Sequence, residues 1–166
     1  MSRVNDKLER WVLDRTRTPS RAEVVRRLET RVTAGADLGQ LRGAALRETR
    51  DAFVRSGRRE DAEQLAYEAH LALAATSLKR PFVSPELPGG TDRTTHACLS
   101  AALAAWVAEQ VSRVPLMPAS IARGVGSGMS AVVGLAKEVM DLGGSGFSRT
   151  DLAANWFGIR NAFREL

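Results

Sequence analysis

Three pairs of polar residues in the second half of the chain have the spacing of neighbours on one helix face. They are Asp92 with His96, Glu138 with Asp141, and Asp151 with Asn155. Residues three or four positions apart share a face, so each pair can direct two side chains toward one site. Carboxylates and a histidine gathered from several helices can form a metal site in a bundle or an acid–base site.

The catalytic candidates are therefore Asp92, His96, Glu138, Asp141 and Asp151. Three of them, His96, Glu138 and Asp141, are also the candidate metal ligands, with the metal and any cofactor left unassigned. A polar group inside an apolar segment is costly unless it is paired. We therefore expect Glu138 to be buried and paired with His96 or Lys137.

Each candidate also has an ordinary structural explanation, which is the favoured one for any single residue. Asp92 stands where a helix begins, and aspartate is a preferred cap there. Asp151 falls in a first helical turn and complements the helix dipole. Glu138 and Asp141 can be solvated near a helix end. A structural polar network, with Lys137, Ser148 and Asn155 as further members, is thus the alternative to an enzyme site.

The elements that position these residues are predicted to be helices. Hydrophobic residues make up 44% of the 166 and aromatic residues only 5%, and no segment alternates with the period of a strand. The pattern predicts an all-α fold of about seven helices. Their expected ranges are 4–14, 20–34, 37–55, 59–78, 92–113, 120–142 and 149–164. The expected caps are Ser20 with Glu23, Asp37, Thr91 or Asp92, and Ser148 with Asp151.

Charge divides the chain into two predicted parts joined by a Pro/Gly linker at 81–91. Residues 1–80 carry 17 Lys and Arg against 12 Asp and Glu, whereas residues 81–166 carry seven of each kind. The first part is a basic helical region, and the second, 92–166, is an apolar helical bundle. Within the first part, 37–78 is expected to form an antiparallel hairpin that is similar to one tetratricopeptide unit, although a generic hairpin is the favoured interpretation.

The second part also carries a set of motifs at 91–162. Its members are Asp92, His96, Lys137, Glu138, Asp141, Gly146, Phe147, Ser148, Asp151, Leu152, Ala154, Asn155 and Gly158. In this order they resemble the pattern of YfiM-like putative lipoproteins and, more distantly, of VanZ-like proteins. The resemblance implies a packed helical body associated with a membrane and a site at these positions. It implies no particular activity, because those families have no assigned reaction.

The function expected from these observations is that of a helical interaction or accessory protein, acting at or near a membrane surface. Residues 1–80 are the expected site for a protein partner. Peripheral contact with a membrane is a further expectation, and nucleic-acid binding is less favoured because acids are interleaved with the arginines. The alternative is a metal-dependent or acid–base enzyme using the residues above. With no signal peptide or convincing membrane span, we expect a cytoplasmic or peripheral protein.

Overall fold

Seven α-helices and no strand make up the part of the chain that the structure, a computed structural model, describes. This part comprises residues 3–59, 61–87, 90–141 and 149–164, and the side chains at 3–5, 137–141 and 149 lie outside it. The helices are α1 (Arg3–Arg15), α2 (Pro19–Thr33), α3 (Leu38–Arg55), α4 (Ala62–Lys79), α5 (Thr91–Ser112), α6 (Ala119–Asp141) and α7 (Arg149–Asn161). The all-α prediction is confirmed.

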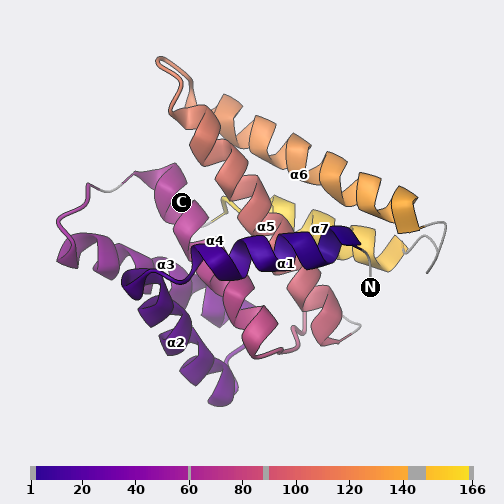
Figure 1. Ribbon diagram of the computed structural model, residues 1–166, viewed down its shortest axis with the longest axis horizontal. Coiled ribbons are helices and arrows are strands. Elements are labelled where there is room, and N and C mark those ends of the chain that lie inside the picture. Colours follow the sequence, from indigo (N-terminus) through magenta and orange to yellow (C-terminus); the bar gives the residue numbers. More distant parts are fainter. Residues whose placement is uncertain (1–2, 60, 88–89, 142–148, 165–166) are drawn as a thin grey trace.

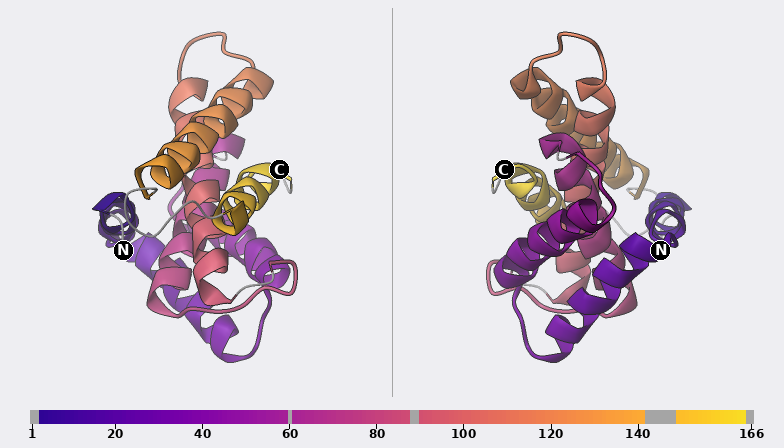
Figure 2. Two further views of the ribbon diagram at one scale, coloured as in Figure 1. Left: turned by 90° about the vertical axis from the view of Figure 1, so that its right-hand side faces the viewer. Right: turned by 90° about the vertical axis from the view of Figure 1, so that its left-hand side faces the viewer.

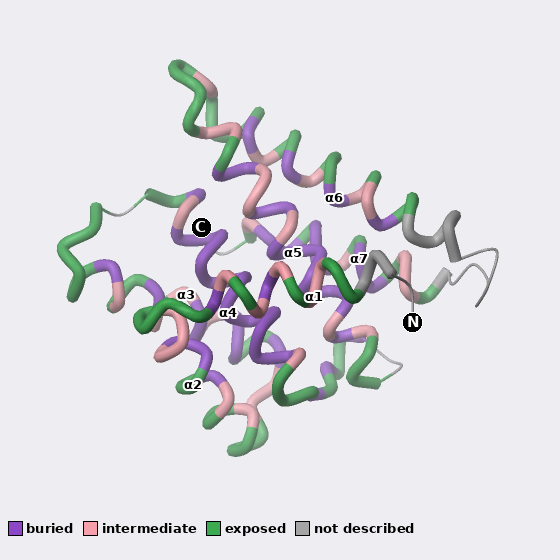
Figure 3. Tube along the Cα trace, viewed as in Figure 1, coloured by how far each residue is buried: buried purple, intermediate pink, exposed green. Residues whose placement is uncertain are grey.

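Two central helices, α4 and α5, organise the packing (Figures 1 and 2). They pack along each other, while α1, α2 and α3 cover α4, and α6 and α7 cover α5. Residues 65–77 of α4 are buried on every side, which fits a run in which eight of the thirteen residues are alanine or leucine. Figure 3 shows the buried trace concentrated in these two helices.

The main hydrophobic core contains residues from both sides of the Pro/Gly segment 81–91, which the sequence predicts to be a linker. Its members come from α1 through α5 and include Ala154 of α7. Helices before and after 81–91 therefore share one apolar core, and the association of α4 with α5 is its centre. The division of the chain into two parts at this segment stays a prediction, which rests on the difference in composition between the two halves.

The helix starts show where local signals hold and where they fail. Asp37 caps α3 in a capping box: its carboxylate accepts from the Gln40 backbone N–H at 2.8 Å, and the Gln40 side chain accepts from the Asp37 N–H at 3.1 Å. The predicted Ser20 cap is wrong. Thr18 precedes α2 without a side-chain capping bond and Pro19 opens the helix, because proline has the φ that a first helical residue needs.

Two other starts also differ from the prediction. Helix α4 begins at Ala62 rather than near 59, because Asp61 accepts from the Gln64 N–H at 2.8 Å. Helix α5 has Gly90 as its cap, so Thr91 and Asp92 lie inside its first turn and neither is the cap. The predicted Ser148 cap lies outside the described residues.

Candidate functional site

Asp92 and His96 are brought together, as their spacing predicts. The His96 Nε2 lies 3.8 Å from an Asp92 carboxylate oxygen, with His96 largely buried and the Asp92 side chain 82% exposed. Glu9 of α1 lies close enough to interact with both, and its pKa is raised by burial first and then by Asp6 and Asp92, while His96 opposes the rise. Among the described residues, no three His, Cys, Asp or Glu side chains converge as a metal site would require.

The other two predicted pairs have different outcomes. Glu138 and Asp141 lie in the last turn and a half of α6, and their side chains, like that of Lys137, are outside the described part of the structure. The expected pairing of Glu138 with His96 or Lys137 therefore stays a prediction. Asp151 is half-buried in the first turn of α7, and Asn155, one turn later, is buried.

Asn155 is the centre of a polar chain that joins three helices. Its side-chain oxygen accepts from the Ser100 hydroxyl of α5 at 2.9 Å, and the Ser100 backbone carbonyl accepts from the Ser130 hydroxyl of α6 at 2.9 Å. A Cβ at Gly134 of α6 would stand 3.1 Å from the Asn155 amide nitrogen. The buried polar groups are thus paired with one another, and this arrangement fixes how α5, α6 and α7 meet.

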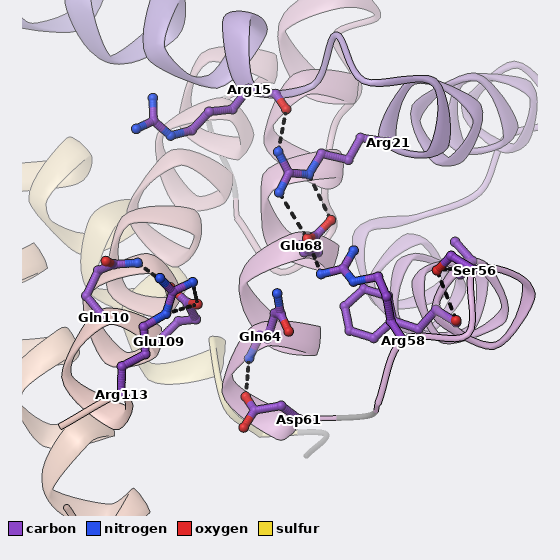
Figure 4. A network of polar contacts seen from close by, with 12 residues as sticks. Arg15, Arg21, Ser56, Arg58, Asp61, Gln64, Glu68, Glu109, Gln110 and Arg113 are labelled. Atoms are coloured by element: carbon purple, nitrogen blue, oxygen red, sulfur yellow. Dashed lines mark hydrogen bonds and ion pairs between the residues drawn. The ribbon is translucent and has the colours of Figure 1, made fainter. Parts of the chain in front are cut away.

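A second polar site, which the sequence did not single out, lies between α2, α3 and α4 (Figure 4). The Glu68 carboxylate is buried, with only 4% of its side chain exposed. It accepts two hydrogen bonds from Arg21, at 2.8 and 3.0 Å, and one from Arg58 at 3.0 Å. Arg21 also donates to the Arg15 carbonyl at 2.9 Å, and the Arg58 guanidinium stacks 4.0 Å from the Phe53 ring centre.

The two arginines keep Glu68 ionised despite its burial. Loss of solvation would by itself raise the pKa of this carboxyl, but the hydrogen bonds and charges of Arg21 and then Arg58 outweigh it and hold the pKa below 4.5. A cavity of about 80 Å³ adjoins the group, and Ser20, Thr49 and Ser56 contribute to its lining. A glutamate between Tyr67 and Ala69, inside the apolar run of α4, is the sequence signal that could have revealed this site.

His70, also on α4, is buried against the end of α7. Its Nε2 lies 2.7 Å from the Ala162 carbonyl, and its Nδ1 has no partner within the described structure. Burial lowers the pKa of His70 to about 4; the hydrogen bond to Ala162 opposes this shift and Arg42 adds to it. The ring is therefore neutral at pH 7 and donates through Nε2.

Mild acid is expected to weaken the fold through His70. Between pH 6.5 and about 4 the unfolded chain binds a proton that the folded chain excludes, so stability falls across this window and is unaffected above it. The loss reaches about 2 kcal/mol at pH 5. Urea unfolding at pH 7 and pH 5 should show this loss in the wild type and a clearly smaller one in His70→Gln, which keeps an N–H donor. An equal loss in both proteins would contradict the assignment.

The outer side of α6 differs from the rest of the surface in being apolar. Its exposed side chains, here called the α6 outer face, are Ile121, Val125, Met129, Val132 and Leu135, each 40–61% exposed. The described charged residue of this helix, Arg123, turns inward and pairs with buried Glu63 of α4 at 2.9 Å. The outer face is therefore left without charge along most of its length.

A groove of about 460 Å³ continues this surface between α6 and α7. Leu135, Leu152, Trp156 and Ile159 line it, and the Trp156 side chain is 59% exposed. Two glycines, Gly124 and Gly128, lie on exposed positions of α6 with open space where a Cβ would stand. In Figure 1, α6 lies at the edge of the molecule.

Comparisons of the chain with protein-family models, with curated proteins and with solved structures found no match. Within the described residues, no helix is both long enough and apolar enough to cross a bilayer.

Proposed function

We propose that this protein is a helical interaction protein that binds the apolar side of an amphipathic helix of a partner protein on the α6 outer face. The observation that carries the proposal is a row of five exposed apolar side chains along one helix beside two unfilled glycine positions. Contiguous apolar surface of this kind is characteristic of interaction sites, whereas single exposed apolar residues are ordinary.

The spacing of the face suits a helix as its partner. Ile121, Val125, Val132 and Leu135 fall at intervals of four, seven and three, which gives a stripe along α6 with Gly128 at its middle. Glycine inside a helix is less favourable than alanine by about 1 kcal/mol, and packing inside this chain does not require Gly124 or Gly128. Small residues at a helix surface allow a second helix backbone to approach closely.

An exposed positive charge beside the groove indicates the chemistry of the partner. Arg160 is exposed on α7 one turn after Trp156, so it lies on the same side of that helix. The proposed partner segment is therefore an amphipathic helix with apolar residues at intervals of three and four and an acidic residue beside them.

The basic first part of the chain supports a partner surface less well. Several of its arginines are already paired with acids of the same chain, as Arg27 and Arg31 are with Glu48 at 2.8 and 3.2 Å. Such pairs form a solvated, internally balanced surface. The proposal accordingly places the partner on α6, although the sequence favoured residues 1–80.

Site-specific cross-linking tests the proposal. A photoreactive residue at Met129 should capture a protein partner in cells that make this protein, whereas the same residue at Val54, which is 73% exposed on α3, should not. The cross-linked helix, made as a peptide, should bind the purified protein and lose binding to Val132→Asp. Capture of lipid, of a second copy of this chain, or of the same proteins from both positions would contradict the proposal.

The Val132→Asp change is expected to leave the isolated protein folded. Val132 is 61% exposed, so its replacement should alter the free energy of unfolding by less than about 1 kcal/mol. Urea unfolding measures this directly. A matched change at buried Val25 of α2 should unfold the protein, because it puts an unpaired charge in the core. A large loss of stability in Val132→Asp would show that the α6 outer face has a role inside the fold.

A further inference from the structure

The cavity beside Glu68 is lined by two arginines with N–H groups that make no hydrogen bond in the described structure. Arg58 has five N–H groups, and within the described structure one nitrogen donates, to Glu68. Arg21 uses its three nitrogens on Glu68 and on the Arg15 carbonyl, which leaves two further N–H groups. A cavity with this lining suits a ligand that accepts hydrogen bonds.

Thr49 gives independent evidence that the cavity is built for a polar ligand. The residue is only 3% exposed, it lines the cavity, and its hydroxyl has no hydrogen-bond partner in the described structure. A buried hydroxyl without a partner is unfavourable, and valine would fill the same space without that penalty. The surrounding atoms shield this hydroxyl, and rotation of the Thr49 side chain to its other rotamer would turn it to a ligand in the cavity that Thr49 lines.

Charge and size narrow the class of ligand. The two guanidinium groups exceed the single Glu68 carboxylate by one positive charge, and the first turn of α2, where Ser20 lines the cavity, contains no acidic residue. A cavity of about 80 Å³ holds several water molecules, since one water needs roughly 10–15 Å³. This is room for one compact group and too little for a nucleotide or a sugar.

We propose that this cavity binds a compact oxyanion, namely phosphate or the phosphoryl end of a small ester, through Arg58, Arg21 and the Thr49 hydroxyl. Glu68 acts as a positioning residue: its hydrogen bonds hold both guanidinium groups at the cavity. Arginine presents planar N–H pairs that match phosphate oxygens, so the geometry favours an oxyanion over a halide. This proposal is independent of partner binding at α6.

The test uses inorganic phosphate and the whole protein. Thermal unfolding is followed as phosphate is added, with potassium chloride at matched ionic strength as the reference, since salt alone screens surface charges. Phosphate should raise the melting temperature further than chloride does, and the rise should increase with phosphate concentration as binding to the folded state requires. Glycerol 3-phosphate in a parallel series shows whether the ion alone or its ester is the better ligand, and binding of either one supports the proposal.

Two variants locate the binding. Thr49→Val should stay folded and bind phosphate about 2- to 12-fold more weakly, and Arg58→Gln at least about tenfold more weakly. Arg26→Gln, which changes an exposed arginine of α2 outside the cavity, should bind as the wild type does. The proposal is overturned if neither phosphate nor its ester stabilises the wild type beyond chloride, or if Thr49→Val and Arg58→Gln respond to phosphate as the wild type does.

Discussion

Replacing Glu68 with glutamine is expected to lower the free energy of unfolding by about 3–5 kcal/mol. The change keeps the size of the side chain but removes the charge that two guanidinium groups surround. Arg21 is then left with 25% and Arg58 with 36% of its side chain exposed and no carboxylate to bind. Breaking a buried ion pair by removing one partner is costly because the remaining charge is uncompensated.

Urea unfolding of Glu68→Gln against the wild type measures this loss, and Asp14→Asn is the matched control. Asp14 pairs with Arg17 at 3.0 Å, but both side chains are more than half exposed, so its loss should change stability by no more than about 1 kcal/mol. Because the folded pKa of Glu68 is lowered, its contribution is present above pH 4.5 and is lost as pH falls through the folded pKa. Equally small losses of stability in Glu68→Gln and Asp14→Asn would mean that the ion pairs of Glu68 with Arg21 and Arg58 are solvated.

The helices could be predicted from sequence because their signals are local. Gly35 and Gly57 end α2 and α3 with φ of +85° and +66°, conformations that glycine adopts without strain, and the predicted ends at 34 and 55 agree with the structure to within one residue. The errors fall at starts, where several residues compete. Ser20 has the side chain of a cap, but Pro19 before it already fits the first turn, and Glu23 pairs with Arg26 and Arg27 instead.

The candidate sites depended on long-range packing and were only partly predictable. Spacing was enough to bring His96 near Asp92, since both lie on α5. It could not bring Arg21 to Glu68, 47 residues away, because that contact depends on how α2 crosses α4. The polar groups of α4 are the more informative ones in hindsight: Glu68 and His70 lie within an apolar helix that is buried on all sides, where each must find a partner.

The glycines of α6 show the same limit. Three glycines, Gly124, Gly126 and Gly128, stand at alternate positions of α6, and of these Gly126 packs closely against α5. Gly124 and Gly128, two positions either side, face away from the protein. Sequence spacing alone cannot decide which glycine faces inward, because the answer depends on the rotation of α6 about its axis.

Two alanine substitutions in α6 are therefore expected to have opposite effects. A Cβ at Gly126 would stand 2.3 Å from the Ala104 carbonyl oxygen and 2.9 Å from the Ala108 nitrogen, both of them backbone atoms of α5. Because neither atom can rotate away, α6 must shift, and Gly126→Ala should destabilise the fold by about 3 kcal/mol. At Gly128 no atom lies within 4 Å of the same position. Gly128→Ala should stabilise the fold by about 0.5–1 kcal/mol, the helix preference of alanine over glycine.

Urea unfolding of the two variants, each compared with the wild type, checks the fold, and peptide binding checks the function. Gly128→Ala should bind the partner helix more weakly although it is the more stable protein, since its methyl group occupies the space into which the partner backbone fits. Higher stability together with weaker binding in Gly128→Ala would show that the space at Gly128 serves binding of the partner helix. If Gly128→Ala binds the cross-linked partner helix as the wild type does, the proposal that a helix approaches closely at Gly128 is wrong. The α6 outer face would then bind its partner through its larger side chains alone.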